Sequence, residues 1–99
     1  MSARWLDLVD PTREELLSSL PVHVDPEVLE VLVAAPPDGH APRPLLEGHG
    51  AYAFAVLVAM RPEKGRIVFQ EIDAIATPEL LVTVRKTAQD GAEIGRAHV

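Results

Sequence analysis

A chain of 99 residues is long enough for one small domain. It carries nine Lys and Arg against 15 Asp and Glu, and the resulting net charge of −6 disfavours a nucleic-acid partner, because neutralising phosphates requires clustered basic side chains. The absence of cysteine excludes disulfides, zinc–thiolate sites and thiol catalysis. The amino terminus lacks the basic and apolar regions of a secretory signal, so we expect a cytoplasmic location.

The first twenty residues predict a strand and a helix. Trp5–Val9 (WLDLV) is apolar apart from one aspartate, and the strand ends before Pro11, which cannot donate to a strand ladder. Thr12 followed by Glu15 has the form of a capping box. We therefore expect a helix that begins after Thr12 and ends before Pro21.

A second helix follows. Asp25 provides a cap and Pro26 occupies the first helical position, where its missing N–H has no cost. Apolar residues occupy nearly every side of the segment up to about Ala35, so we expect this helix to be well buried. The proline-rich segment 36–44 then predicts a loop.

The second half of the chain predicts strands. Ala51–Met60 (AYAFAVLVAM) has no charge and alternates large with small side chains, so we expect a central strand covered on both faces. Pro44–Glu47 precedes it as a short edge strand, and Arg66–Ala76 and Leu80–Arg85 follow it as an antiparallel meander. The predicted fold class is α/β: a short first strand, two helices, then an antiparallel meander, together forming a mixed sheet covered by helices.

The periodic pattern stops after Lys86. The tail has few apolar residues, and its last seven residues, Glu93–Val99, match one reading-frame translation of a widely used sequencing adapter. We therefore expect an α/β domain over residues 1–90 and an unstructured tail over residues 91–99 that is a sequence artefact.

Motifs for catalysis are absent from the sequence. It contains no nucleophile elbow, phosphate-binding glycine loop, dinucleotide fingerprint or zinc-protease helix motif. Serine is confined to Ser2, Ser18 and Ser19, and no Ser–His–acid set has a suggestive spacing. We expect no enzymatic activity, no catalytic residues and no cofactor-binding residues.

Histidines are possible metal ligands. His23 with Asp25 can supply one set, and His40 and His49 flank the proline-rich segment. Ligand sets usually show tighter spacing, so exposed loop histidines are the simpler interpretation. His98 belongs to the tail.

A pair of acids is the other candidate for metal binding. Glu71 and Asp73 are two residues apart on a predicted strand, so their carboxylates can share one face of the sheet. Such a pair can hold Mg²⁺ together with water. A solvated strand face is the simpler interpretation, because exposed acids are common.

Five segments, in order, resemble the amino-terminal cytoplasmic domain of CorA-type magnesium/cobalt transporters. The match covers Trp5 to about Lys86. The segments are W-L-D-L-V-D-P-T-x-E-E-L (Trp5–Leu16), D-P-E-V-L-E (Asp25–Glu30), R-P-L-L-E (Arg43–Glu47), the apolar strand with Tyr52 and Phe54, and E-I-D-A-I-A-T-P-E-L-L-V-T-V (Glu71–Val84).

The resemblance implies an α/β domain at the cytoplasmic face of the cell membrane, below a pentameric channel, that senses Mg²⁺ between subunits. A metal-ligating Asp of the family is Val31 here, which leaves the preceding acid, Glu30, as the candidate metal ligand and implies weak Mg²⁺ binding. The long helix, both membrane helices and the G-M-N signature are absent from this sequence. The resemblance therefore implies a regulatory fragment that cannot transport by itself and reaches the membrane only through missing carboxy-terminal helices.

Two functions stay open. The first is a cytoplasmic regulatory domain fragment of a CorA-like Mg²⁺/Co²⁺ transporter, a homo-pentamer in its full-length form. The second is a freestanding soluble α/β module that binds a ligand or a protein. An enzyme is a distant third, because no motif supports it.

Overall fold

The computed structural model describes residues 4–34, 43–87 and 89–93, with side chains through Thr87. These residues form β1 (Arg4–Val9), α1 (Arg13–Ser19), α2 (Pro26–Val33), β2 (Leu45–Gly48), β3 (Ala53–Glu63), β4 (Arg66–Ala76), β5 (Leu80–Arg85) and β6 (Gln89–Glu93). Every helix and strand expected from the sequence is present, and β6 is an additional strand.

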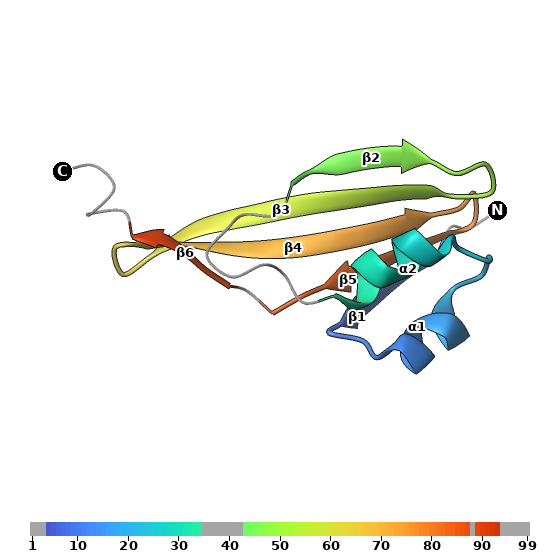
Figure 1. The fold of residues 1–99 in the computed structure, drawn as a ribbon, viewed down its shortest axis with the longest axis horizontal. Helices are drawn as coiled ribbons and strands as arrows, with labels where there is room; N and C mark the ends of the chain where they lie inside the picture. Colours follow the sequence, from blue (N-terminus) through green and yellow to red (C-terminus); the bar gives the residue numbers. More distant parts are fainter. Residues whose placement is uncertain (1–3, 35–42, 88, 94–99) are drawn as a thin grey trace.

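The strands form one mixed sheet in the order β1-β5-β4-β3-β2 (Figure 1). β1 is parallel to β5, and the other pairs are antiparallel. β6 pairs with β4 beyond the end of β5. The α/β prediction is confirmed, including a first strand, two helices and a meander.

Local sequence explains the start of each helix. In α1, Thr12 Oγ1 accepts from the Glu15 amide at 3.1 Å and the Glu15 carboxylate accepts from the Thr12 amide at 2.8 Å, which confirms the capping box. Helix α2 begins with Pro26 after Asp25, as predicted, but the Asp25 side chain makes no capping hydrogen bond. Its carboxylate contacts His49 instead.

Both helices pack on the same face of the sheet, and the core lies between them and the strands (Figure 1). The register places Phe54, Ile75 and Val82 side by side across β3, β4 and β5. Leu16 of α1 and Leu32 of α2 close over this face, with 0% and 1% of their surfaces exposed. Fully burying an aliphatic side chain of this size contributes about 1.5–3 kcal/mol.

The opposite face of the sheet has no helix over it among the described residues, so the expectation that Ala51–Met60 is covered on both faces is wrong. Leu57 of β3 is 52% exposed there, and Trp5 and Leu46 are 70% and 78% exposed. The large side chains Tyr52, Phe54 and Val56 face the helices, whereas the alternate positions are mostly alanine. Two helices of seven and eight residues cover one face only.

A polar network crosses β1 and β5 on this bare face. The Trp5 indole N–H donates to Thr83 Oγ1 at 2.9 Å, and the Thr83 hydroxyl donates to Asp7 at 2.7 Å. Arg85 forms an ion pair with Asp7 at 2.7 Å. These interactions lower the pKa of Asp7. The hydrogen bond from Thr83 has the largest effect, and the hydrogen bond from Arg85 has the next largest.

The hairpin of β3 and β4 turns at Lys64 and Gly65, between the two strands that the sequence predicts. Their φ angles are 51° and 78°, the pair of positive values typical of a two-residue hairpin turn. Glycine adopts such an angle without a steric penalty. Both strands are 11 residues long and extend well beyond the helices (Figure 1).

The carboxy-terminal residues differ from the expected unstructured tail in part. β6 (Gln89–Glu93) pairs with the hairpin end of β4, so residues 91–93 belong to a strand. Residues 94–99 lie outside the described part of the chain. The alternation that reveals other strands is missing in QDGAE, which contains one apolar residue.

Candidate functional site

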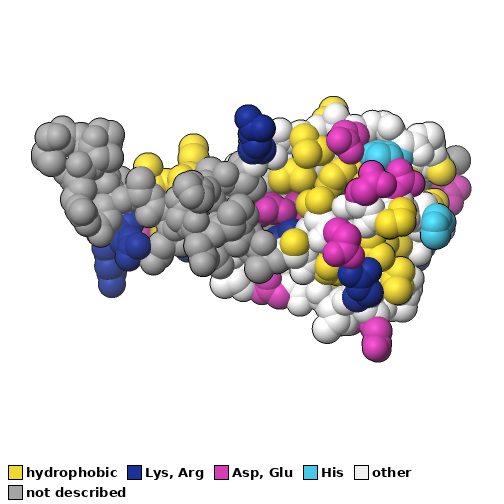
Figure 2. Space-filling model, in the orientation of Figure 1, with side chains coloured by type: hydrophobic (Ala, Val, Ile, Leu, Met, Phe, Trp, Pro, Cys, Tyr) yellow, Lys and Arg dark blue, Asp and Glu magenta, His cyan; other side chains and the backbone are white. Residues whose placement is uncertain are grey.

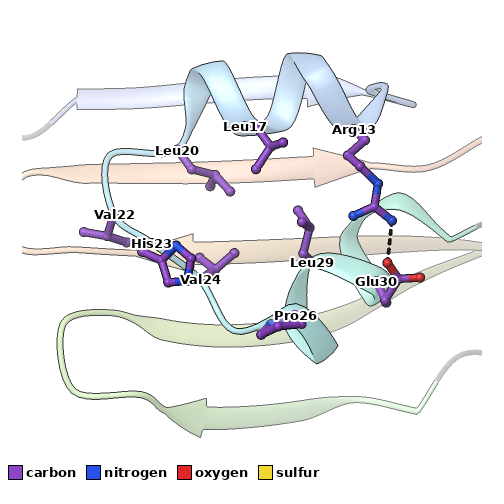
Figure 3. Close-up of a pocket in the computed structure, with 9 residues that line it drawn as sticks. All are labelled: Arg13, Leu17, Leu20, Val22, His23, Val24, Pro26, Leu29 and Glu30. Carbon is purple, nitrogen blue, oxygen red and sulfur yellow. Dashed lines mark hydrogen bonds and ion pairs between the residues drawn. The ribbon is translucent and has the colours of Figure 1, made fainter.

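A pocket opens between the two helices and the segment that connects them (Figure 3). Its volume is about 330 Å³. The lining consists of Arg13, Leu17, Leu20, Val22, His23, Val24, Pro26, Leu29 and Glu30. Since six of these nine side chains are apolar, the pocket suits an apolar group.

An ion pair spans one end of this pocket. Arg13 reaches from α1 to Glu30 of α2, and His23 lies near the opposite end (Figure 3). The Arg13 and Glu30 side chains are 49% and 65% exposed, so the pair contributes at most about 1 kcal/mol. On the face that carries the helices, apolar patches lie between acidic side chains (Figure 2).

The predicted metal ligand Glu30 therefore faces a guanidinium in this structure. Among residues 4–34, 43–87 and 89–93, no group of three or more His, Cys, Asp or Glu is arranged to hold a metal ion. Glu30 as a ligand, and Mg²⁺ as its ion, stay predictions.

Three charged side chains lie buried beneath α2, and we call them the buried triad (Glu71, Asp73 and Lys86). Their exposed fractions are 5%, 0% and 3%. The Lys86 Nζ lies 2.8 Å from Glu71 Oε2 and 2.9 Å from Asp73 Oδ2. It also donates to the carbonyl of Val31 near the end of α2.

The buried triad overturns the interpretation of Glu71 and Asp73 as a solvated strand face. The Lys86 ammonium also occupies the position between the carboxylates that a Mg²⁺ ion would need. Sequence reasoning missed Lys86 because the predicted strand ended at Arg85. A signal existed: Lys86 continues the alternation of Val82 and Val84, which face the core.

Asp73 is the unusual member of the buried triad. Burial raises its pKa to about 8, the neighbouring Glu71 carboxylate adds to the rise, and Lys86 opposes it. Neither carboxylate oxygen of Asp73 accepts a well-aligned hydrogen bond from the described residues. At neutral pH a protonated Asp73 leaves one negative charge, on Glu71, against the Lys86 ammonium.

A second set of polar residues joins the start of α2 to the turn between β2 and β3, and we call it the histidine bridge (Asp25, Glu47, His49 and Tyr52). His49 Nδ1 lies 3.1 Å from Asp25 Oδ2, and Nε2 lies 3.0 Å from Glu47 Oε1. The imidazole stacks on the Tyr52 ring, with centroids 4.9 Å apart and planes 2° from parallel. The Tyr52 hydroxyl accepts from the Asp25 amide at 3.0 Å.

The histidine bridge corrects the interpretation of His49 as an exposed loop histidine, since its side chain is only 19% exposed. His23 is exposed, in line with that interpretation, and His40 and His98 lie outside the described residues. Asp25, considered as a partner of His23, contacts His49 instead. Only the Glu47–His49 spacing, which places two side chains on one side of an extended segment, hints at the bridge in the sequence.

Carboxylates at both ring nitrogens determine what His49 can do. The bond to Glu47, followed by the bond and charge of Asp25, raises the pKa of His49, while partial burial opposes the rise. The protonated ring donates through both nitrogens. In this arrangement His49 has no free lone pair for proton abstraction or metal binding, so the bridge is an anchor.

Comparisons with known proteins find no matching family model, no matching curated protein and no matching solved structure. Among the described residues, the structure has no helix that is long and apolar enough to cross a membrane.

Proposed function

We propose that the chain is the amino-terminal regulatory domain of a CorA-like divalent-cation transporter, located at the cytoplasmic face of the membrane and without transport activity of its own. The observation that carries the proposal is the placement of the five matched segments. They fall on β1 with α1, on α2, on β2, on β3, and on β4 with β5, in chain order. The segment that resembles a strand and capped helix is a strand followed by a capping box.

The bare face of the sheet supports membership in a larger protein. It exposes Trp5, Leu46 and Leu57, and Val9 and Leu81 are 58% and 38% exposed. Apolar side chains gathered on one face commonly mark a surface that another segment or subunit covers. The outer edges of β1 and β2 are also unpaired among the described residues, and unpaired edges favour association.

Metal sensing in this proposal depends on Glu30. A divalent cation at Glu30 has to compete with Arg13, and among the described residues Glu30 belongs to no group of three or more His, Asp or Glu arranged to hold a metal ion. We therefore expect weak Mg²⁺ binding by the single chain, with further ligands supplied by a neighbouring subunit of the pentamer.

The decisive experiment is to sequence the source DNA downstream of the Asp90 codon. If the proposal is correct, the open reading frame continues and encodes a long charged helix followed by two apolar segments of about 20 residues, with G-M-N after the first apolar segment. A natural frame that closes without an apolar segment overturns the transporter assignment.

Metal binding is tested separately on the 99-residue chain by titrating Mg²⁺ and following amide chemical shifts. The expected result is a weak response centred on Glu30 that is lost in Glu30→Gln and retained in the control Glu79→Gln. A response that Glu30→Gln leaves unchanged removes Glu30 as the ligand. The titration can fail while the reading frame still supports the family.

The pocket between α1 and α2 favours a second function, a freestanding ligand-binding module. Its apolar walls and polar rim have the composition of a small-molecule site. A screen of small apolar carboxylates by NMR tests this function: shifts confined to Leu17, Leu20 and Leu29, and reduced in Leu29→Gln, support it. Shifts that Leu29→Gln leaves unchanged, or no shifts at all, contradict it.

A further inference from the structure

Helix α2 has only eight residues, too few to be stable by itself in water. Its position therefore depends on contacts with the sheet. The fully buried apolar side chains of the helix are Val28 and Leu32, which are 3% and 1% exposed, and its other apolar side chains pack partly against the same core. In addition, both ends of the helix are attached to the sheet by groups that bind protons, and this arrangement is independent of the proposed transporter function.

The first end is attached by the histidine bridge. The groups that face His49 are the carboxylates of Asp25 and Glu47 and the hydroxyl-bearing ring of Tyr52. Only a protonated imidazole can donate to both carboxylates at once. When the ring loses its proton, one of the two bonds becomes a contact between a lone pair and a carboxylate, which is repulsive.

The second end is attached by Lys86. Its ammonium contacts the Val31 carbonyl of α2, Glu71 and Asp73, and the remaining neighbours of Asp73 across the sheet are the apolar Val56 of β3 and Val84 of β5. A protonated Asp73 leaves Lys86 balanced by Glu71. A deprotonated Asp73 adds a second negative charge in a fully buried position, where an unpaired charge is costly.

We propose that α2 is a proton-dependent element of the fold: protons on His49 and Asp73 hold its two ends on the sheet, and loss of either proton loosens the corresponding end. The two groups act in the same direction. A basic shift in pH weakens both attachments, whereas the apolar contacts of the helix do not change. The result is a helix that opens locally, without opening of the sheet, and opens more readily as pH rises.

Amide hydrogen exchange of the 99-residue chain tests this proposal, because it reports local opening residue by residue. The Leu29 amide, bonded to the Asp25 carbonyl, reports the first end, and the Ala34 amide, bonded to the Glu30 carbonyl, reports the second. After correction for intrinsic exchange, both protection factors should fall by about tenfold or more between about pH 6 and about pH 9. Amides at the centre of β4, which exchange when the whole sheet opens, should stay better protected than both of these amides at each pH.

Two variants separate the ends. Asp73→Asn resembles the protonated acid, so Ala34 should stay protected at high pH while Leu29 still loses protection. His49→Gln should lower the protection of Leu29 at the low pH and remove its pH dependence, with Ala34 unaffected. Asp7→Asn, on the bare face, is the control and should leave both profiles of α2 unchanged.

Two results would overturn the proposal: α2 protection that is constant with pH, or α2 protection that equals that of β4 at each pH, because the helix would then open only together with the sheet. If Asp73→Asn does not fold, the carboxyl carbon of Asp73 is titrated by NMR in the unmodified chain. If the Asp73 carboxyl group loses its proton at about pH 4, as an ordinary aspartate does, Asp73 does not have the proposed role.

Discussion

The two faces of the sheet each hold an aspartate beside a basic side chain, and the two aspartates behave in opposite ways. On the bare face, hydrogen bonds from Thr83 and Arg85 lower the pKa of Asp7. On the covered face, burial raises the pKa of Asp73 although Lys86 lies 2.9 Å away. A cationic partner therefore does not by itself determine the charge of an acid, because the helices above Asp73 remove the water that would stabilise its carboxylate.

The substitution with the largest expected effect on this difference is Lys86→Met. Removing the ammonium leaves Glu71 and Asp73 buried without a cation, so we expect a loss of about 3–5 kcal/mol in the free energy of unfolding. Urea denaturation followed by circular dichroism measures it. Lys64→Met, in the exposed hairpin turn, is the matched control and should change stability by less than about 0.5 kcal/mol. Equal effects of the two substitutions would show that the buried triad is not an electrostatic unit.

A comparison of leucines tests the apolar part of the same difference. Leu32→Ala on the covered face removes a side chain that is 1% exposed, and we expect a loss of about 2–5 kcal/mol. Leu57→Ala on the bare face removes one that is 52% exposed, and we expect a loss below about 1 kcal/mol. Thermal and urea unfolding measure both. A large loss for Leu57→Ala would mean that another copy of the chain covers the bare face in solution.

The pH dependence of stability isolates Asp73. Its pKa is higher in the folded chain than in the unfolded chain, so the folded state holds the extra proton between about pH 4 and about pH 8. Stability should fall as pH rises through this window, by at most about 1.4 kcal/mol per pH unit, and then level off. Asp73→Asn should remove this fall and increase stability at about pH 8. An unchanged profile in Asp73→Asn would assign the fall to other groups.

The smallest expected effect is that of Asp7→Asn. Asp7 has a lowered pKa in the folded chain. Its contribution to folding stability is therefore present above the ordinary aspartate pKa and is lost as pH falls through the lowered pKa. The variant should therefore lose a little stability near neutral pH and show a shallower acid transition. Unfolding curves at several acidic pH values measure both. A change as large as that of Asp73→Asn would contradict the contrast between the faces.

The starts of the helices and the antiparallel meander were predictable because their signals are local, whereas the parallel pairing of β1 with β5 was not predicted. The capping box joins Thr12 to Glu15, three residues later, and the positive φ angles of the hairpin turn belong to the adjacent residues Lys64 and Gly65. The covered face was predicted incorrectly, because the alternation of Ala51–Met60 shows which side chains are large but not how many helices are available to cover them. The pocket was not predictable, since α1 and α2 meet only in the folded chain.

The two polar clusters were missed for a related reason. The buried triad combines residues of β4 and the end of β5 with a carbonyl of α2, and the histidine bridge pairs His49 with Asp25, 24 residues earlier. Each residue alone has a simpler local interpretation, as a cap, a surface acid or a loop histidine. In the sequence, only the alternation of Val82, Val84 and Lys86 along one strand indicated that Lys86 faces the core.

The contact between Lys86 and Val31 also has a consequence for the order of folding. The two residues are 55 positions apart in sequence, and the contact needs β4 paired with β5 and α2 already docked. Because ions keep their hydration until the core closes, we expect this contact to form after the rate-limiting step of folding. Substitutions of Lys86 should then accelerate unfolding and leave the folding rate nearly unchanged, so that the buried triad sets the lifetime of the native state.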